Sequence, residues 1–222
     1  RGDLAILGPT DPALLDSLPQ GGLVMTEQAG TSTLLVSHAN WVVAFGYDDT
    51  ALSSQIADTV VIFVPKSRSE LSLRLALALS LVKAGGRLLL VGEKKEGVAR
   101  AVRQLSEQLP QSEKVDSARH CQVWQADGVS CAADSELADW MQWHEIERHD
   151  VRLAVAGLPG IFSDGELDAG TGMLLDSLAD SPLRPGAVLD FACGAGVIGA
   201  WLQCYQAQRS VEVFPVDGVD VQ

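Results

Sequence analysis

The apolar residues of this chain fall into short continuous runs that are separated by longer amphipathic stretches. Continuous apolar runs predict buried strands, most clearly at residues 59–64, where the run is rich in β-branched residues, and at residues 87–92. Apolar residues that recur every three or four positions predict helices at residues 69–82 and 97–109, and Pro110 closes the second. Strands that alternate with helices of about 10–15 residues are typical of βαβ units and a mainly parallel sheet.

Weaker patterns complete the predicted order of elements. Further strands are expected at residues 4–7, 23–25, 41–47, 115–123, 151–155 and 187–190. Further helices are expected at residues 11–18, 51–57, 171–178 and 197–202, and the charged stretch 127–150, with Trp140 and Trp143, is interpreted as a linking helix. We therefore predict an α/β protein with a first domain at 1–130, a linker at 131–158 and the start of a second domain at 159–222.

Composition narrows the class of protein. The chain is 47% hydrophobic and 20% charged, as in ordinary soluble globular proteins, and it has no apolar run of the ~18 residues that a membrane span needs. The four cysteines, Cys121, Cys131, Cys193 and Cys204, follow no metal-ligand spacing. We expect reduced thiols, a cytoplasmic location and no bound metal.

The charge is distributed unevenly along the chain. A net charge of −13 argues against a general nucleic-acid binder, but residues 66–119 hold eleven bases and six acids. A polyanion such as RNA would therefore bind here, and the alternative is a pair of well-solvated helices. The candidate RNA-binding residues are Lys66, Arg68, Lys94, Lys95, Arg100, Arg103 and Arg119.

The most informative motif is the glycine-rich stretch from Asp190 to Gly196. It follows an apolar run at 187–189 and precedes the helical pattern at 197–202. A strand, a glycine-rich turn and a helix make up a nucleotide-cofactor loop, because glycines let the backbone approach the ligand and the helix start offers unpaired N–H groups.

Three segments together carry a family resemblance. They are the lead-in at 158–171 (Leu-Pro-Gly-Ile-Phe-Ser-Asp-Gly-Glu-Leu-Asp-Ala-Gly-Thr), the stretch 188–196 with Asp190 and Cys-Gly-Ala-Gly, and residues 115–121. With them the chain resembles the bacterial 16S rRNA guanine-N2 methyltransferases of the RsmC type, and more loosely their 23S rRNA relatives. The resemblance implies two tandem Rossmann-like class I methyltransferase domains, the first of them degenerate and the second truncated here.

Two departures from the family pattern place the degeneracy in the first domain. Its opening strand is followed by Leu7-Gly8-Pro9-Thr10 in place of an Asp-x-Gly-x-Gly loop. After the strand at 59–64 it has Val64-Pro65-Lys66-Ser67, where an active amino-methyltransferase carries Asn-Pro-Pro-Phe/Tyr. We expect this domain to keep the fold without cofactor chemistry.

The resemblance implies S-adenosylmethionine as the cofactor of the second domain. Cys193, Gly194 and Gly196 would lie under its methionine part, and Asp190 would hold its ammonium group. Asp220 would accept the ribose hydroxyls, with Asp217 as the second candidate and a solvated acidic tail as the alternative. The lead-in residues Phe162, Asp168, Gly170 and Thr171 would fold over the cofactor, although Asp168 or Thr171 could also cap a helix. Ala192 replaces the usual first glycine of the loop and weakens this expectation.

The implied activity is methyl transfer to the exocyclic N2 of a guanine in 16S rRNA of the small ribosomal subunit, by a monomer. The chain contains one asparagine, Asn40, and no Asn-Pro-Pro segment, so we expect no catalytic residue and no activity within these 222 residues. Because it lacks an initiating Met, we also expect residues missing at its start. Alternatives are another class I amino-nitrogen methyltransferase, acting on 23S rRNA or protein glutamine, and a non-catalytic RNA-binding fragment. A nicotinamide-binding protein is disfavoured because the full G-x-G-x-x-G spacing is absent.

Overall fold

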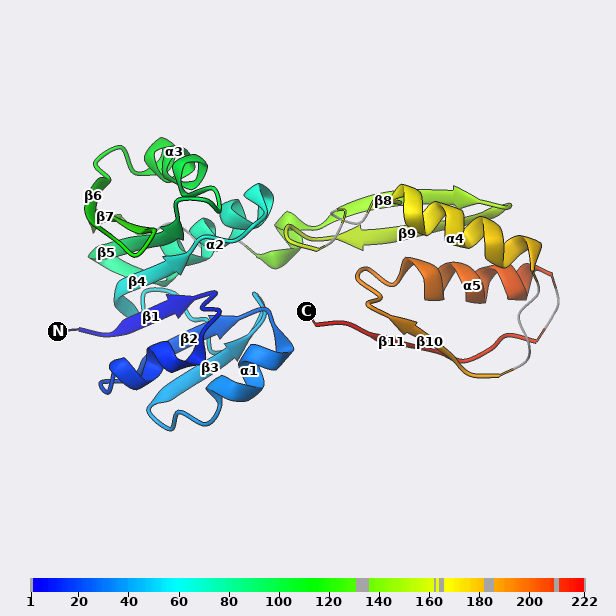
Figure 1. The fold of residues 1–222 in the computed structure, drawn as a ribbon, viewed down its shortest axis with the longest axis horizontal. Coiled ribbons are helices and arrows are strands. Elements are labelled where there is room, and N and C mark those ends of the chain that lie inside the picture. The colour runs from blue at the N-terminus through cyan, green and yellow to red at the C-terminus, as the bar shows by residue number, and fades with distance from the viewer. Residues whose placement is uncertain are drawn as a thin grey trace. The chain divides into compact units, whose positions relative to one another are not determined.

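The computed structural model describes residues 2–130, 136–161, 163, 166–181, 186–209 and 212–221. The chain forms two compact units, Arg1–Asp139 and Trp140–Gln222 (Figure 1). The first unit has one seven-stranded sheet and the second has two two-stranded sheets, and each unit has its own apolar core.

The first unit is built on a seven-stranded mixed sheet. Its strands are β1 (Leu4–Leu7), β2 (Gly22–Thr26), β3 (Trp41–Phe45), β4 (Ala57–Phe63), β5 (Val82–Glu93), β6 (Glu113–Ala118) and β7 (Cys121–Val129). Their order is β3-β2-β1-β4-β5-β7-β6, with the first five parallel and β7 antiparallel to both of its neighbours. This is a doubly wound sheet in which the strand order reverses between β1 and β4.

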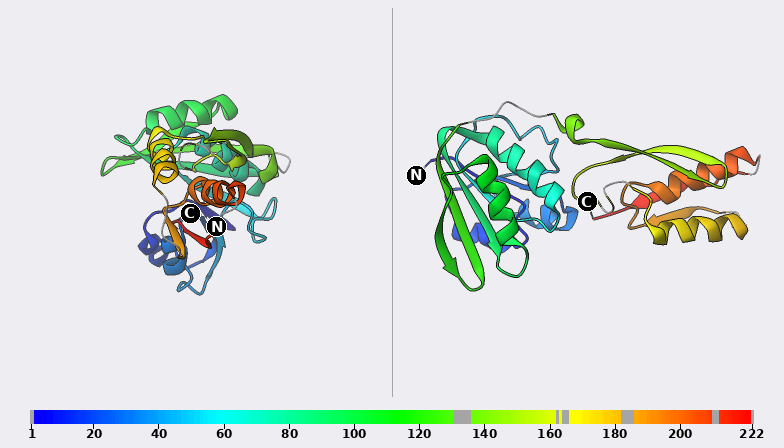
Figure 2. Two further views of the ribbon diagram at one scale, coloured as in Figure 1. Left: turned by 90° about the vertical axis from the view of Figure 1, so that its right-hand side faces the viewer. Right: turned by 90° about the horizontal axis from the view of Figure 1, so that it is seen from above.

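Helices cover both faces of this sheet (Figure 2). The helices α2 (Arg68–Leu81) and α3 (Val98–Gln108) pack on β4 and β5 and bury one apolar cluster. The 3-10 helix η1 (Pro12–Ser17) and α1 (Ala29–Leu35) lie over β1, β2 and β3 and close a second cluster. Ser67 begins α2 by accepting a hydrogen bond from the Glu70 amide at 3.3 Å. The α/β prediction is confirmed, and burial on both faces explains why 59–64 is apolar throughout.

The second unit combines a hairpin with a βαβ unit. A 3-10 helix η2 (Leu137–Trp140) leads into the antiparallel strands β8 (Gln142–Arg148) and β9 (Val151–Gly157). The helix α4 (Ala169–Asp180) follows, and then the parallel pair β10 (Val188–Phe191) and β11 (Val216–Val219), which is joined through α5 (Val197–Gln208). Its core consists of Val151, Leu175, Trp201 and Leu202.

Three sequence-based interpretations of secondary structure are wrong. The stretch 127–150 is not one linking helix: its described residues hold the end of β7, the short η2 and the strand β8, and the hairpin of β8 with β9 takes up most of the predicted linker. The run 115–123 is two strands, since Arg119 and His120 both have positive φ and make a tight turn. No helix forms at 51–57, whereas α1 forms from residues that favour helices weakly.

Candidate functional site

Ligands of doubly wound sheets bind beyond the carboxyl ends of the strands, where the strand order reverses. In the first unit this point lies between β1 and β4. Gly8 comes directly after β1 and Glu27 directly after β2. Tyr47 is the second residue after β3, and Phe63 is the last residue of β4. These four residues border the crevice in which the fold would place a nucleotide.

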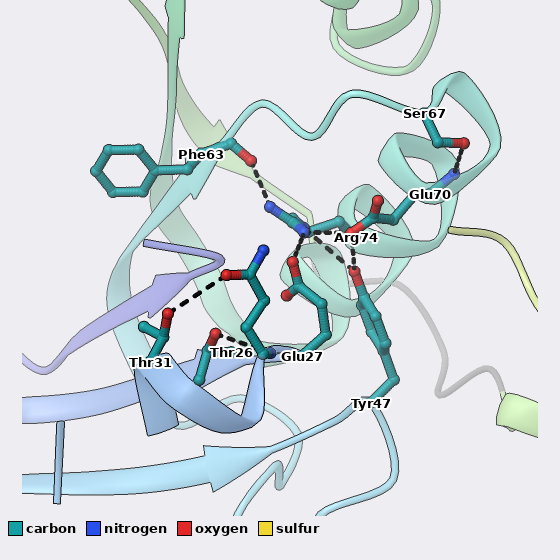
Figure 3. A network of polar contacts seen from close by, with 9 residues as sticks. Thr26, Glu27, Thr31, Tyr47, Phe63, Ser67, Glu70 and Arg74 are labelled. Atoms are coloured by element: carbon teal, nitrogen blue, oxygen red, sulfur yellow. Dashed lines mark hydrogen bonds and ion pairs between the residues drawn. The ribbon is translucent and has the colours of Figure 1, made fainter. Parts of the chain in front are cut away.

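Arg74 occupies this crevice (Figure 3). Its side chain comes from α2 and is 2% exposed. Nη1 donates to the carbonyl oxygen of Phe63 at 2.7 Å, Nη2 donates to Glu27 Oε1 at 3.0 Å, and Nε donates to the hydroxyl of Tyr47 at 3.2 Å. A Cβ placed on Gly8 would lie 1.9 Å from Nη1, so the guanidinium sits directly against the end of β1.

The Arg74 network holds more negative than positive charge. Glu70, four residues earlier on α2, also accepts from Nη2, and the hydroxyl of Tyr47 donates to Glu70 at 3.3 Å. Burial raises the pKa of Glu70 and of Tyr47, and Arg74 opposes both shifts. Burial alone would lower the pKa of Arg74, but the combined effect of Tyr47, Glu27 and Glu70 is larger, so the pKa is raised overall. Arg74 therefore stays charged and neutralises one of the two carboxylates that it contacts, the buried Glu70 and the partly buried Glu27.

This network is a physical reason to expect no cofactor in the first unit. Glu27 follows the second strand, at the place where a carboxylate accepts ribose hydroxyls in dinucleotide folds. Its Oε1 already accepts a hydrogen bond from Arg74 Nη2. Sequence reasoning did not single out these residues. The available signal was the pair Glu70 and Arg74, two opposite charges at i,i+4 in a helix whose other residues are mainly leucine, alanine and serine.

The corresponding point in the second unit is the loop between β10 and α5. Ala192, Gly194 and Gly196 have φ values of 61°, 52° and 74°. The amides of Ala192 and Cys193 donate to the carbonyl oxygen of Val219 at 2.8 and 3.2 Å, which holds the loop on β11. A Cβ on Gly194 or Gly196 would meet no atom within 4 Å, so the space over the loop is open. At these two positions, unlike at Gly8 in the first unit, no side chain of the described residues lies against the loop.

Asp190 lies beneath this loop and is buried. Its Oδ2 accepts from the amide of Gly199 at 3.2 Å, in the first turn of α5, while Oδ1 has no hydrogen-bond partner in the described part of the chain. A Cβ on Gly199 would lie 3.0 Å from Val216, so glycine allows α5 to approach β11 closely. Asp190 therefore fixes the helix start and keeps one carboxylate oxygen available.

Asp220 closes the loop from the end of β11. Its Oδ2 accepts from the amide of Gly194 at 2.7 Å, and its Oδ1 accepts from the amide of Val221 at 2.6 Å. Asp217, the second candidate, is an exposed residue of β11 opposite Leu189. The structure thus brings Asp190, Cys193, Gly194, Gly196 and Asp220 together.

The lead-in residues form the start of α4. Asp168 Oδ1 accepts from the amides of Gly170 and Thr171 at 2.9 and 3.2 Å, and the Thr171 hydroxyl donates to Oδ2. The Thr171 hydroxyl bond, followed by the two amide bonds, lowers the pKa of Asp168. Among the described residues, none of these bonds reaches the loop at 192–196, and Phe162 lies outside the described residues. The helix-cap alternative therefore describes Asp168 in this structure.

The predicted RNA-binding residues lie along one end of the first unit's sheet. Lys66 and Arg68 follow β4, and Lys94 and Lys95 follow β5. The turn with Arg119 lies beside them, because Glu93 pairs with Cys121 and the Lys94 amide donates to the carbonyl oxygen of His120 at 2.8 Å. The two remaining residues, Arg100 and Arg103, are in the first two turns of α3. We call these seven residues the basic edge.

Within the described part of the chain, the side chains of the basic edge are free of ion pairs, as is the exposed Lys114 of β6. All seven side chains are exposed, and none makes an ion pair within the described residues. In contrast, Arg74, Lys83, Arg87, Arg148 and Arg152 each contact a carboxylate, and Arg209 stacks on Tyr205 at 3.6 Å. Uncompensated positive charge therefore gathers at this end of an otherwise acidic chain.

The described ranges hold neither a membrane-spanning helix nor a metal-binding cluster. No helix in them has the length and apolarity to cross a bilayer. They contain no group of three or more His, Cys, Asp or Glu side chains arranged to hold a metal ion.

Comparison with family models gives two matches. Residues 2–144 match the model described as methyltransferase small domain N-terminal, and residues 152–222 match the methyltransferase small domain. The two matches correspond to the two structural units and together cover nearly the whole chain.

Curated proteins and a solved structure extend these matches. The chain is 38% identical over 221 residues to a ribosomal RNA small subunit methyltransferase C of Pseudomonas putida, and covers 64% of it. It is 40% identical over 163 residues to the protein of the same name from Acinetobacter baylyi, covering 73% of this chain and 47% of that one. The T. thermophilus 16S rRNA N2 G1207 methyltransferase, solved with AdoMet and guanosine, matches the whole chain with a TM-score of 0.75 at 21% identity. The chain spans about half to two thirds of these proteins' lengths.

Proposed function

Because this chain belongs to the methyltransferase small-domain family, as its matches over residues 2–144 and 152–222 establish, we propose that it forms part of an S-adenosylmethionine-dependent methyltransferase. The reaction we propose is methyl transfer to the exocyclic N2 of a guanine in 16S rRNA. The similarity to proteins named ribosomal RNA small subunit methyltransferase C supports this choice over 23S rRNA or protein glutamine as the substrate.

The observation that carries the proposal is the contrast between the two crevices. The guanidinium of Arg74 fills the first, whereas the second has an open glycine loop above the buried carboxylate of Asp190. Residues that fit the methionine part of the cofactor are Cys193, Gly194 and Gly196, whose backbone groups lie at the start of α5. We therefore assign cofactor binding to the second unit.

When bound, the cofactor supplies an electrophilic methyl group. The free Oδ1 of Asp190 would accept from the cofactor's ammonium group, while Oδ2 keeps its bond to Gly199 and holds the loop in place. Asp220 would accept from the ribose hydroxyls in exchange for the Gly194 amide. Asp168 and Thr171 would help to cover the cofactor by fixing the start of α4. Phe162 lies outside the described residues, and its contact with the cofactor stays a prediction.

The groups that accept the guanine amine are not assigned to residues 1–222, because this sequence has no Asn-Pro-Pro segment. The exocyclic nitrogen is a weak nucleophile, so catalysis depends on positioning and electrostatics. We propose that the described residues provide the donor pocket and the basic edge, and that these 222 residues alone transfer no methyl group.

We propose the basic edge as the RNA-contacting surface. Seven exposed cations without ion pairs in the described residues can neutralise several phosphates without first breaking a contact. We also propose that the partner is 16S rRNA, either free or within the small ribosomal subunit, and that the enzyme is a monomer located in the cytoplasm.

The test measures cofactor binding, RNA binding and methyl transfer separately. Calorimetric titration of the 222-residue chain with S-adenosylmethionine should give one site per chain, and Gly196→Val should abolish it. Labelled-methyl transfer to 16S rRNA should be absent for this chain. No cofactor binding, or transfer to RNA by these residues alone, would contradict the proposal.

A further inference from the structure

A small hollow lies between the first turns of α2 and α3 in the first unit. It has a volume of about 20 Å³, and Lys66, Ser67 and Arg68 line it at the start of α2. Gly97 and Arg100 line it at the start of α3, and Gln104 lines it one turn further on. A volume of this size admits one water-sized group.

The electrostatics of the hollow favour an anion at its rim. The amide groups in the first turn of a helix carry partial positive charge, and two helices of 14 and 11 residues begin here. Gly97 begins α3 in the left-handed conformation without a side-chain cap. Lys66, Arg68 and Arg100 are exposed, and none makes an ion pair within the described ranges. The one opposing charge in the lining is the exposed carboxylate of Glu96.

Gln104 provides an independent observation that points to a hydrogen-bond donor. The residue is 7% exposed, and its Nε2 donates to the carbonyl oxygen of Arg68 at 3.3 Å and to the Ser72 hydroxyl. Because the Arg68 oxygen can only accept, the amide nitrogen must face it. Gln104 Oε1 is then buried without a hydrogen-bond partner among the described residues. An unpaired buried acceptor is costly, so a group that donates a hydrogen bond is expected there.

We propose that this hollow binds one phosphate of an RNA strand together with the adjacent 2′-hydroxyl. The phosphate lies at the rim against Lys66, Arg68 and Arg100, and the hydroxyl enters the hollow and donates to Gln104 Oε1. DNA offers the phosphate but not the hydroxyl, so the site prefers RNA. The inference rests on the proposed function in one respect, since it takes RNA as the partner of the basic edge.

The position of the site in the fold gives it a role in that function. Residues 64–67 follow β4, at the place where an active amino-methyltransferase would carry Asn-Pro-Pro-Phe/Tyr. In this unit the same loop contributes Lys66 and Ser67 to the hollow. The loop after β4 therefore grips the RNA backbone and takes no part in methyl transfer.

The test measures binding of a labelled single-stranded RNA, and of DNA of the same sequence, to the 222-residue chain by fluorescence anisotropy. The double variant Lys66→Ala, Arg100→Ala should lose about tenfold in affinity for both strands, because hydrogen bonds to charged groups are lost. Its slope of log affinity against log salt should also become shallower by about one. Glu96→Gln should bind both strands more tightly. Lys114→Ala is the matched control, since Lys114 is an exposed cation of β6 outside the basic edge, and it should bind as the parent does.

A second variant tests the hydroxyl. The parent chain should bind RNA about threefold to tenfold more tightly than DNA, and Gln104→Met should remove this preference while leaving DNA binding unchanged. Guanosine 3′-monophosphate should compete with the RNA only weakly. If the monophosphate binds as tightly as the strand, the site belongs to a free nucleotide and the RNA assignment is overturned.

The outcomes separate this inference from the proposed function. If Lys94→Ala and Arg119→Ala weaken RNA binding but the Lys66, Arg100 double variant matches Lys114→Ala, the basic edge stands and the phosphate site is refuted. If the parent chain binds no RNA, both the site and the RNA-contacting role of the basic edge are refuted, while cofactor binding by the second unit is unaffected.

Discussion

Arg74 Nη2 lies 3.0 Å from Glu27 Oε1 and thereby joins the middle of α2 to the residue that follows β2. Arg74 is buried and Glu27 is partly buried, and the pair occupies the point in the first sheet where a nucleotide would bind. A cation of the protein thus stands where a ligand would donate its hydroxyls. The same network places two carboxylates and one guanidinium together inside the first unit, so both carboxylates depend on Arg74.

Removing the cation should therefore destabilise the first unit strongly. Arg74→Met leaves the carboxylates of Glu27 and Glu70 without their partner, and such a loss costs about 3–5 kcal/mol in the free energy of unfolding. Urea denaturation followed by circular dichroism measures it. The control Arg87→Met breaks the exposed pair with Asp127 and should leave the midpoint almost unchanged. Equal effects of the two variants would refute the role assigned to Arg74.

In the second unit, acid should weaken the contact between the hairpin and α4. Asp176 accepts from Arg148 Nε at 2.8 Å and from His149 Nε2 at 2.7 Å, and these bonds, with that from Arg148 the larger cause, lower the pKa of Asp176 to about 2. Because the folded-state pKa lies below the unfolded value of about 3.9, the stabilisation is complete above that pH and is lost as the pH falls toward 2.

Urea unfolding between pH 5 and 2 should show this loss by comparison with Asp176→Asn. The free energy of unfolding of the parent should fall more steeply than that of the variant through the window from about 4 to about 2. Parallel curves for the two proteins would mean that the Arg148 and His149 contacts do not stabilise the unit.

The loop of the second unit contains a residue with an unfavourable backbone conformation. Ala192 has φ of 61°, a region that costs an L-residue about 1–2 kcal/mol. Ala192→Gly removes this cost and adds chain entropy of about 0.5–1 kcal/mol, so the net gain in stability should be about 0.5–1 kcal/mol. The matched control is Ala200→Gly in α5, at an exposed helical position, where the same change should destabilise by about 1 kcal/mol. Destabilisation of similar size by both variants would contradict the strain.

Much of the architecture follows from local patterns. The continuous apolar runs at 59–64 and 87–92 became β4 and β5, because a strand that is covered on both faces needs apolar residues at every position. The stretch from Asp190 to Gly196 predicted a strand, a turn and a helix, and each is present. The basic edge was predicted as a set of residues, but only the pairing of β5 with β7 brings Arg119 beside Lys94.

What the sequence could not provide depends on contacts between distant residues. Arg74 reaches Glu27 across 47 positions and Tyr47 across 27, so no local pattern indicates that it fills the first crevice. The strand predicted at 151–155 is part of β9, but β8 was mistaken for part of a helix, because its residues are mostly polar or charged and only Ile146 among them is buried. The partnerless oxygen of Gln104 likewise follows from the packing of α3 against α2.

The most direct test of the account is a crystal structure of the 222-residue chain grown with S-adenosylmethionine. The account predicts one cofactor molecule per chain, over residues 192–196, with Asp190 Oδ1 in contact with the ammonium group and Arg74 still bound to Glu27. Cofactor bound at Glu27 with Arg74 displaced, or a loop at 192–196 that stays empty at saturating cofactor, would contradict it.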